Sequence, residues 1–502
     1  MRFEHKAGVR RRLILSFVVT ITVTLAIAGF NPFRRSVQPH APLPEFTAHL
    51  DRRITSLMRL YNIPGCSMAL VEDYQLVWLK AYGYADVEQK RPLTVDTPMS
   101  VQSISKAVTA WGVMHLVDHG ELDLDAPIVE YLKTWQFPQS AFPTEKITSR
   151  QLLSHSAGLP LGDVFAIYAP EEQRPTLREM LTREAVLMAE PGQRFSYSNT
   201  GFNLLELLIE DITGEAFAAY MERVVLKPLG MENASFTWRA DFDPAVPVGY
   251  NLKHQPVPVY VYAAKASGGL FATAKDIATF AIGEMAGEDA QVLSAAGMRA
   301  MYEDHSSNLG IYGLVFDFYG LGHYVEVLDH DTFAISHGGQ GNGIMTHYHA
   351  VPNTGDAIVI LTNSQRSWPF IAAVLSDWAH WRGFPPLGMG RILWGKIALW
   401  LLAAIICWVS LLLLLQAGRA SRAANHLRRS VHLPLRQWIK VVIAVLIFCG
   451  LGWCISQKYL FLTAVFPRAT NGLGVSLFIL GVALLVSAFV QGKLFRSNPH
   501  QW

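Results

Sequence analysis

The sequence is poor in cysteine, with four in 502 residues. Cys407, Cys449 and Cys454 lie in apolar runs near the C-terminus, so the rest of the chain contains Cys66 alone and can form no internal disulfide. Zinc-type cysteine spacings and the His-Glu-x-x-His motif of zinc peptidases are both absent from it. We therefore expect neither a bound metal nor a cofactor.

An excess of charge of one sign is also missing. The 42 basic and 40 acidic residues leave a net charge of +2, which gives no electrostatic reason to expect a nucleic-acid partner. The Gly-x-Ser-x-Gly elbow of α/β-hydrolases does not occur either. Nucleic-acid binding and α/β-hydrolase chemistry are therefore disfavoured.

Long apolar runs are plentiful, and the first follows a basic N-terminus. The run 13–30 comes directly after three arginines, and Ala26-Ile27-Ala28 within it has the small-x-small pattern of a signal-peptidase site. The run is also near the minimum of about 17 residues that can span a bilayer. Residues 1–35 are therefore either a signal peptide or an N-terminal membrane anchor, and both would export the segment that comes after them.

Three further apolar runs, 397–415, 441–456 and 473–490, indicate transmembrane helices, the alternative being core helices of a soluble domain. The segment between the first two runs carries six basic residues and no acid, and two more basic residues follow the third run. The positive-inside rule makes both basic segments cytoplasmic. We therefore predict a membrane domain at 394–492 in the cytoplasmic (inner) membrane of a bacterium, with the preceding domain on the periplasmic or extracellular side.

The segment 45–384 has strand patterns at both ends and helix patterns between them. The expected elements are a helix at 45–60, a strand hairpin at 67–71 and 75–82, a helix from Ser103, helices at 181–190, 201–214 and 274–286, and strands at 310–320, 332–339, 343–351 and 356–364. This order predicts an α/β (α+β) fold, with an antiparallel sheet completed by distant parts of one chain, flanking helices and an inserted all-helical lobe.

A Ser-x-x-Lys pair, Ser103 and Lys106, stands where a polar stretch turns into a helix-period run with apolar residues on one side. Residues three apart are neighbours on a helix, so the amine can reach the hydroxyl. A lysine whose pKa is lowered by burial can take the serine proton, or can hold another base in its anionic form. The alternative is a solvated helix face without function.

The tripeptide Tyr197-Ser198-Asn199 precedes the helix predicted at 201–214. A phenol near Lys106 can act as the general base for Ser103 and return the proton to the leaving group. Asn199 offers both a donor and an acceptor to a substrate amide. If the tripeptide is considered by itself, the alternative interpretation is a core tyrosine followed by an asparagine that caps the helix.

The third element, His337-Gly338-Gly339, ends a predicted strand. Two glycines there let a substrate lie close to the backbone. The N–H of Gln340 could form an oxyanion hole with that of Ser103. A purely structural His337 is the alternative. Two further histidines, at 347 and 349, share one face of a predicted strand, but no third ligand completes a metal site.

In order and spacing, these three elements resemble the serine penicillin-recognising superfamily of class C β-lactamases, DD-peptidases, D-aminopeptidases and related esterases. The resemblance covers residues 45–380 and includes the stretches Leu152–Pro160 and Ala266–Phe280. His-Gly-Gly stands in place of the more familiar Lys-Thr-Gly, and Tyr-Ser-Asn points to the class C-like branch. The resemblance implies a sheet flanked by helices with a helical lobe.

For the chemistry, the resemblance implies an acyl-enzyme on Ser103, with Lys106 as its proton partner and Tyr197 as the general base. The combination of an exported hydrolase and three C-terminal helices also resembles the colibactin-type prodrug peptidases, which remove an N-acyl-D-asparagine cap. In those peptidases, however, the position that matches Asn199 is a serine.

We therefore expect a membrane-anchored serine hydrolase that cleaves an amide or ester bond in D-amino-acid-containing peptides, peptide-like metabolites or β-lactams, with peptidase or β-lactamase activity favoured. Its partners would be that small-molecule or peptide substrate and the lipid bilayer. The alternative is a sensor or scaffold that binds envelope ligands without turnover.

Overall fold

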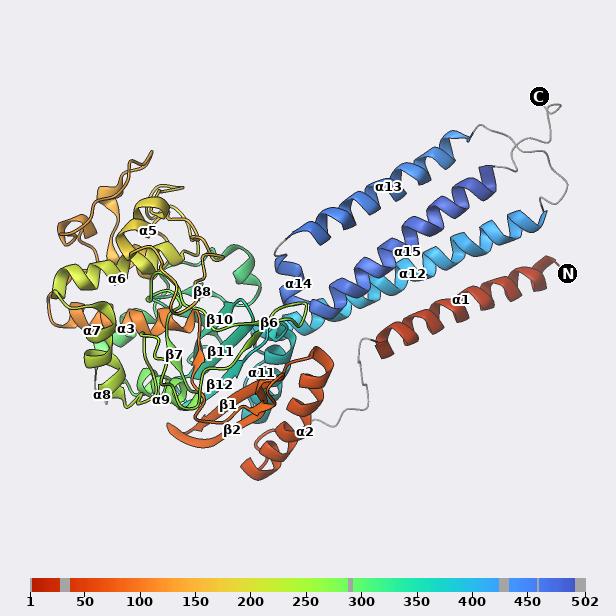
Figure 1. The fold of residues 1–502 in the computed structure, drawn as a ribbon. Coiled ribbons are helices and arrows are strands. Elements are labelled where there is room, and N and C mark those ends of the chain that lie inside the picture. The colour runs from red at the N-terminus through yellow and green to blue at the C-terminus, as the bar shows by residue number, and fades with distance from the viewer. Residues whose placement is uncertain (1, 28–36, 288–291, 424–432, 458–459, 493–502) are drawn as a thin grey trace. The chain divides into compact units, whose positions relative to one another are not determined.

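The structure is a computed structural model that describes residues 2–27, 37–287, 292–423, 433–457 and 460–492. The chain forms two compact units (Figure 1). One unit is Val37–Arg391, and the other combines Met1–Ser36 with Ile392–Trp502. Ala28, the last residue of the predicted signal-peptidase site, lies outside the described residues.

An antiparallel sheet forms the centre of the first unit, with the strand order β3-β2-β1-β12-β11-β10-β9-β8 among the described residues. Its strands are β1 Gly65–Glu72, β2 Gln75–Asp86, β3 Arg91–Pro92, β8 Phe318–Tyr319, β9 Tyr324–Val327, β10 Phe333–Gly341, β11 Ile344–Val351 and β12 Asp356–Thr362. Strands β1 and β12 pair in the middle, with Cys66 opposite Thr362. The predicted sheet built from distant parts of one chain is therefore confirmed.

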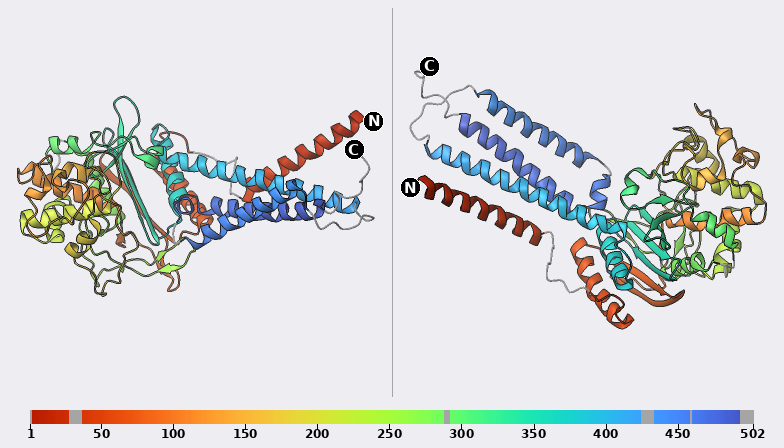
Figure 2. Two further views of the ribbon diagram at one scale, coloured as in Figure 1. Left: turned by 90° about the horizontal axis from the view of Figure 1, so that it is seen from above. Right: turned by 180° about the vertical axis from the view of Figure 1, so that it is seen from behind.

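Helices cover both faces of this sheet, as the view from above shows (Figure 2, left). On one face, α9 (Ala274–Met285) packs against β1, β11 and β12. On the other, α11 (Trp368–Arg382) packs against β12 and against α2 (Leu43–Tyr61), whose Phe46 ring stacks on Trp381 at 4.1 Å between centroids. Every residue of β12 is buried, as expected for a strand covered on both faces.

A long insertion between β3 and β8 carries the remaining helices of this unit. They are α3 Ile104–Asp118, α4 Ser149–Leu153, α5 Leu177–Glu184, α6 Asn199–Thr213, α7 Phe217–Met221, α8 Lys227–Leu229, α9 and α10 Ala295–Met301. The predicted inserted helical lobe is confirmed. The same insertion also holds two small sheets that the sequence did not predict, which pair β4 (Met99–Ser100) with β7 (Phe271–Ala272) and β5 (Gly249–Tyr250) with β6 (Pro256–Val257). Strands of two residues are too short to leave an alternating pattern in the sequence.

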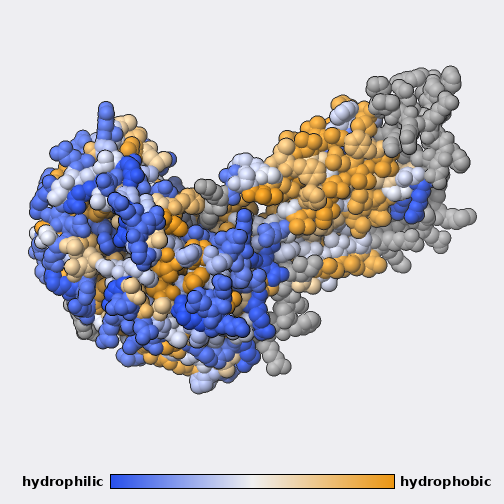
Figure 3. Space-filling model, in the orientation of Figure 1, coloured by the Kyte–Doolittle hydropathy of each residue, from blue (hydrophilic) through white to orange (hydrophobic). Residues whose placement is uncertain are grey.

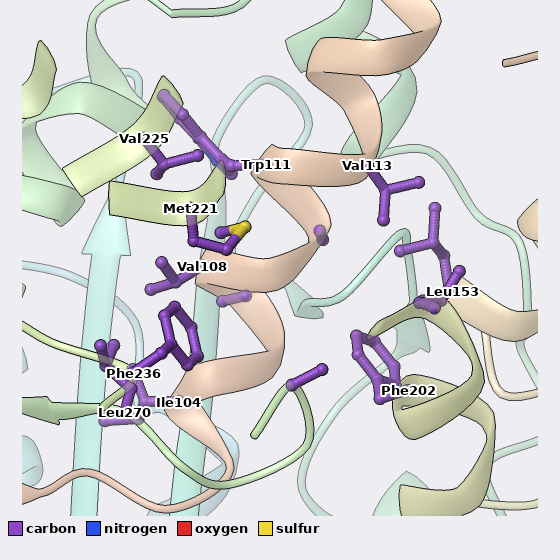
Figure 4. Packing of buried hydrophobic residues seen from close by; sticks show 14 of the residues in the cluster. Ile104, Val108, Trp111, Val113, Leu153, Phe202, Met221, Val225, Phe236 and Leu270 are labelled. Carbon is purple, nitrogen blue, oxygen red and sulfur yellow. The ribbon is translucent and has the colours of Figure 1, made fainter. Parts of the chain in front are cut away.

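Helix α3 lies in the core of the insertion and is buried on nearly all sides, whereas the sequence suggested one apolar face. Figure 4 shows Val108 and Trp111 turned toward Met221 and Val225, while Val113 faces Leu153 on the opposite side. A helix that is apolar all round belongs in a core. The start of α3 is consequently held in place by packing from several elements.

Two predicted elements differ from the structure. The helix expected at 181–190 ends at Glu184, and Val186 and Met188 after it are exposed. The strand expected at 310–320 is a 3₁₀ turn, Gly310–Leu314, followed by the two residues of β8. Gly310 has a φ of +58°, which takes the backbone out of the extended conformation.

The second unit contains the long apolar helices. Its described helices are α1 Arg2–Ile27, α12 Arg391–Ala423, α13 Leu435–Ser456, α14 Phe461–Val465 and α15 Pro467–Gly492. In the part of the chain that the structure describes, α12, α13 and α15 are long and apolar enough to cross a membrane, which confirms the three predicted long apolar helices. On the face seen in Figure 3, most of the surface of these helices is apolar.

Candidate active site

Ser103 is the residue that directly precedes α3, and its position depends on an unusual backbone conformation. Gln102 has a φ of +55°, a left-handed conformation that only a well-fixed side chain stabilises. Its side-chain amide donates to Ser100 Oγ at 2.7 Å, and its oxygen accepts from Tyr262 at 2.7 Å. The half-buried Ser103 is thus presented at the start of a rigid, buried helix.

Lys106 lies one turn further along and is fully buried. Its Nζ is 3.1 Å from Ser103 Oγ, 2.7 Å from Asn199 Oδ1 and 2.7 Å from the carbonyl oxygen of Ser267. None of the described acidic residues pairs with it, and burial lowers the pKa of this amine well below its usual value. A neutral amine has two N–H groups, which match the two obligate acceptors and leave its lone pair for the serine hydroxyl.

Tyr197 lies beside this pair, in the loop that leads into α6. Its ring centroid is 4.9 Å from Lys106 Nζ, and its hydroxyl interacts with that of Ser103. Burial raises the pKa of this phenol, and the contact with Ser103 offsets part of the rise. The structure therefore brings Ser103, Lys106 and Tyr197 together, with the phenol protonated at rest.

Asn199 begins α6 and is held by its contacts on both sides. Its backbone N–H donates to the carbonyl of Leu161 at 3.0 Å, and Ser198 caps the helix by accepting from the N–H of Gly201 at 2.9 Å. Because Lys106 already donates to the side-chain oxygen, the NH₂ group of Asn199 is the part that can donate to a substrate carbonyl.

The glycines of β10 let this strand run against the residues before Ser103. A Cβ on Gly339 would lie 2.2 Å from the carbonyl oxygen of Val101 and 2.2 Å from Thr346 Oγ1, and one on Gly338 would meet the Trp368 ring at 2.8 Å on the other face. Gln340 follows, and its side-chain oxygen accepts from Trp368 Nε1 at 3.0 Å. The strand end therefore lies alongside the start of α3.

His337 is fully buried on the face of β10 that points toward Tyr197, with 6.3 Å between their ring centroids. Its Nδ1 donates to the carbonyl of Gly338 at 2.8 Å, so Nε2 accepts from the Tyr319 hydroxyl at 3.2 Å. Burial, with a contribution from the nearby Lys106, lowers the pKa of this imidazole well below its usual value. His337 is therefore a neutral residue beneath the site.

The sequence profile of the Beta-lactamase family matches residues 50–375, which is most of the first unit. The chain belongs to the beta-lactamase family. Over 207 residues it is 28% identical to Protein flp of Staphylococcus aureus (strain N315), a match that covers 41% of each protein. The matched segment therefore spans about two fifths of that relative's length.

Solved structures of beta-lactamase relatives share this architecture. The octameric penicillin-binding protein homologue from Pyrococcus abyssi superposes with a TM-score of 0.59 at 26% identity, covering 68% of this chain and 78% of that one. A class C beta-lactamase superposes with a TM-score of 0.53 at 21% identity, covering 65% of this chain and 94% of that one. The latter likeness shows the fold, and the predicted β-lactamase-like fold is confirmed.

Within this beta-lactamase-family site, sequence reasoning missed His155, which is fully buried and has a φ of +57°. Its Nδ1 accepts from the backbone N–H of Ser198 at 3.1 Å, and its ring lies 4.3 Å from the Tyr197 ring. Burial lowers its pKa well below the usual value, so it stays a neutral acceptor. His155 lies in the stretch Leu152–Pro160, which carries part of the family resemblance, and that position was the available signal.

Glu206 and Ser267 were also missed. Glu206 is buried in α6 and accepts from the backbone N–H groups of Lys265 and Ala266, which fixes the loop that supplies the Ser267 carbonyl to Lys106. Backbone acceptors leave no trace in a side-chain pattern. The described residues contain no cluster of three or more metal-ligating side chains.

Proposed function

We propose that the unit Val37–Arg391 is a serine hydrolase that cleaves an amide or ester bond through an acyl-enzyme on Ser103. The observation that carries the proposal is the environment of Lys106, a buried amine with two obligate acceptors and a serine hydroxyl around it. A binding module has no need of an activated nucleophile, so this environment favours turnover over the sensor or scaffold alternative.

In the proposed reaction, Ser103 Oγ attacks the substrate carbonyl carbon and its proton passes to Lys106. Burial lowers the pKa of the amine, which favours its neutral form, and raises the pKa of the Tyr197 phenol, which keeps the phenol protonated. The amine is therefore the group with a free lone pair at rest. The Tyr197 phenol then donates its proton to the leaving nitrogen or oxygen and is reprotonated from Lys106. This assignment of Lys106 as the proton acceptor and Tyr197 as the proton donor differs from the expectation that Tyr197 is the general base. The reason is that a buried phenolate would be unfavourable.

The carbonyl oxygen becomes an oxyanion when Ser103 adds to it. The backbone N–H groups of Ser103 and Gln340 are the proposed donors, and one such donor typically contributes about 3 kcal/mol to the transition state. Asn199, Gly338 and Gly339 would line the path of the bound substrate, and His337 would support the strand from below. Water then attacks the acyl-enzyme and releases Ser103.

The proposed substrates are peptides that contain D-amino acids, peptide-like metabolites or β-lactams. Removal of an N-acyl-D-asparagine cap is a narrower hypothesis within this class, and Asn199 in place of serine argues against it. A fluorescent penicillin and a fluorophosphonate probe should each label the full-length protein and not its Ser103→Ala variant. Equal labelling of both proteins would remove Ser103 as the nucleophile.

We also propose that α12, α13 and α15 span the cytoplasmic membrane with the hydrolase outside it. Their apolar surfaces support this, as do the basic segments that the positive-inside rule makes cytoplasmic. Alkaline phosphatase fused after residue 386 should be active and a fusion after residue 425 inactive. The opposite result would invert the topology.

The N-terminal helix α1 is proposed to remain as a fourth span and not to be cleaved. Trp408 Nε1 of α12 donates to Ser16 Oγ at 3.1 Å, and the Phe17 ring lies 5.0 Å from the Trp408 ring. Within 14–26, the half-buried positions recur every four residues and include Ser16, Thr20 and Thr24, a small-residue face that suits helix packing in lipid. Intact mass of the purified protein should therefore include residues 1–28.

A further inference from the structure

A pocket with a volume of about 170 Å³ lies next to the candidate active site. Two of its lining residues are direct neighbours of the catalytic arrangement. Tyr262 donates to the side chain of Gln102, the residue before Ser103, at 2.7 Å. Gly268 follows Ser267, whose carbonyl accepts from Lys106. A group held in this pocket therefore lies beside residues that position the nucleophile and its amine.

Aromatic side chains form much of the pocket wall. Tyr260 and Tyr262 meet edge to face at 5.6 Å between centroids, and Trp238 meets Phe271 in the same way at 5.6 Å. A dry cavity of about 150 Å³ is enough to bind benzene. The pocket can therefore take one six-membered ring, and the ring faces and edges around it favour an aromatic guest.

The charged side chains that line the pocket are positive. Among the described residues that line it, Lys265 and Arg174 are the charged ones. Lys265 is 36% exposed with Nζ 3.7 Å from the buried carboxylate of Glu206, and Arg174 donates to the carbonyl of Pro170 at 3.2 Å. The described lining residues therefore carry two positive charges, one of which Glu206 offsets from outside the lining.

We propose that this pocket is a subsite for an aromatic group that carries a carboxylate, with the ring between the aromatic walls and the anion at Lys265 and Arg174. The inference rests on the proposed function, because it names the class of substrate that the same site would hydrolyse. Each exposed charge pair changes binding by up to about fivefold. The preference for an anionic ring should therefore be at most about 25-fold for the two cations together, and added salt should reduce it.

The test compares 4-nitrophenyl esters of three benzoic acids, with a carboxylate, a carboxamide or a trimethylammonium group at the 4-position. These groups vary the charge of the ring, and dividing each kcat/KM by the rate constant for hydroxide hydrolysis of the same ester removes their electronic effect on the reacting carbonyl. After this correction, the full-length protein should show a higher kcat/KM for the carboxylate than for the carboxamide, by up to about 25-fold, and the trimethylammonium ester should be the poorest. The ratio should fall toward one in the double variant Arg174→Met with Lys265→Met.

The double variant Lys275→Met with Arg299→Met is the matched control. It removes the same two kinds of charge from exposed positions in α9 and α10, outside the pocket lining, and should leave the ratio as it is in the unmodified chain. A ratio near one in the unmodified chain would overturn the proposal. A ratio that both double variants lower equally would also overturn it, because net charge would then be the cause.

Binding to the full-length Ser103→Ala variant separates this proposal from the proposed function. Saturation-transfer NMR should show 4-carbamoylbenzoate bound more tightly than terephthalamide, by up to about 25-fold, with the difference lost in the Arg174→Met and Lys265→Met background. Equal binding of both probes would refute the subsite. Ester turnover by the Ser103→Ala variant would refute the role of Ser103 as the nucleophile but would not contradict the proposed subsite.

Discussion

The substitution Gly339→Ala tests the close approach of β10 to the start of α3. The added Cβ would lie 2.2 Å from the Val101 carbonyl oxygen, where ordinary contacts begin near 3.4 Å, so the strand and the Ser103 loop must separate by about 1.2 Å. A misplacement of about 1 Å can cost about 100-fold in rate, or about 2.7 kcal/mol. We expect kcat/KM on a 4-nitrophenyl ester to fall by about that factor.

The comparison is Gly338→Ala, in which the backbone proposed to line the substrate path stays and the added Cβ points to the opposite face of the same strand. Its Cβ would meet the edge of the Trp368 ring at 2.8 Å, which is a side chain that can give way, and not the backbone before Ser103. Both variants should lose about 1–3 kcal/mol of unfolding free energy from overpacking, measured by denaturant titration. If Gly339→Ala kept kcat/KM within threefold of the unmodified chain, the reasoning on this strand would be refuted.

Three other changes test the surroundings of the nucleophile. Lys106→Met should reduce ester kcat by about 10²–10⁴-fold. It should also flatten the pH dependence of stability. Between the lowered pKa of the folded lysine and about 10.4, the unfolded lysine binds a proton that the folded one does not, so the unfolding free energy of the unmodified chain rises with pH over that window. His155→Phe keeps a ring beside Tyr197 but loses the acceptor for the backbone N–H of Ser198, and leaving that N–H without a partner costs about 1–3 kcal/mol. The fall in kcat should be larger than in His155→Asn, because asparagine tolerates the left-handed backbone at this position. Equal losses of kcat in the two variants would contradict the acceptor role. Glu206→Leu should lower kcat more than Glu206→Gln, which keeps one acceptor for the Lys265 and Ala266 N–H groups, as stopped-flow acylation rates can show.

The strands and helices with strong periodicity were predictable from the sequence. The hairpin of β1 and β2, the helix α6 and the strands β10 to β12 follow the expected ranges because alternation or a 3.6-residue period extends over the whole element. The turn at Gly310–Leu314 was not predictable in this way. Aromatic residues such as Tyr312 and Phe316 favour a strand by composition, whereas the positive φ of Gly310 takes the backbone out of the extended conformation.

The side chains of the site could be named from the sequence, but their supports could not. Ser103, Lys106, Tyr197 and Asn199 were identified by residue type and order, whereas the acceptor for Lys106 on Ser267 is a backbone carbonyl. The left-handed conformations of Gln102 and His155 also have no counterpart in residue patterns, because both residues are ordinarily right-handed or extended. Such features depend on tertiary packing, which a linear pattern does not contain.

The pairing of β1 with β12 has a consequence for biosynthesis. The backbone N–H of Gly65 donates to the Asn363 side chain, across 298 residues of sequence. The middle of the sheet therefore cannot close until almost the entire first unit has left the ribosome, and contacts of such long range make folding slow. Helix α12 begins at Arg391, soon after β12 ends, so the last strand of the sheet and the first of the three long apolar helices leave the ribosome close together in time.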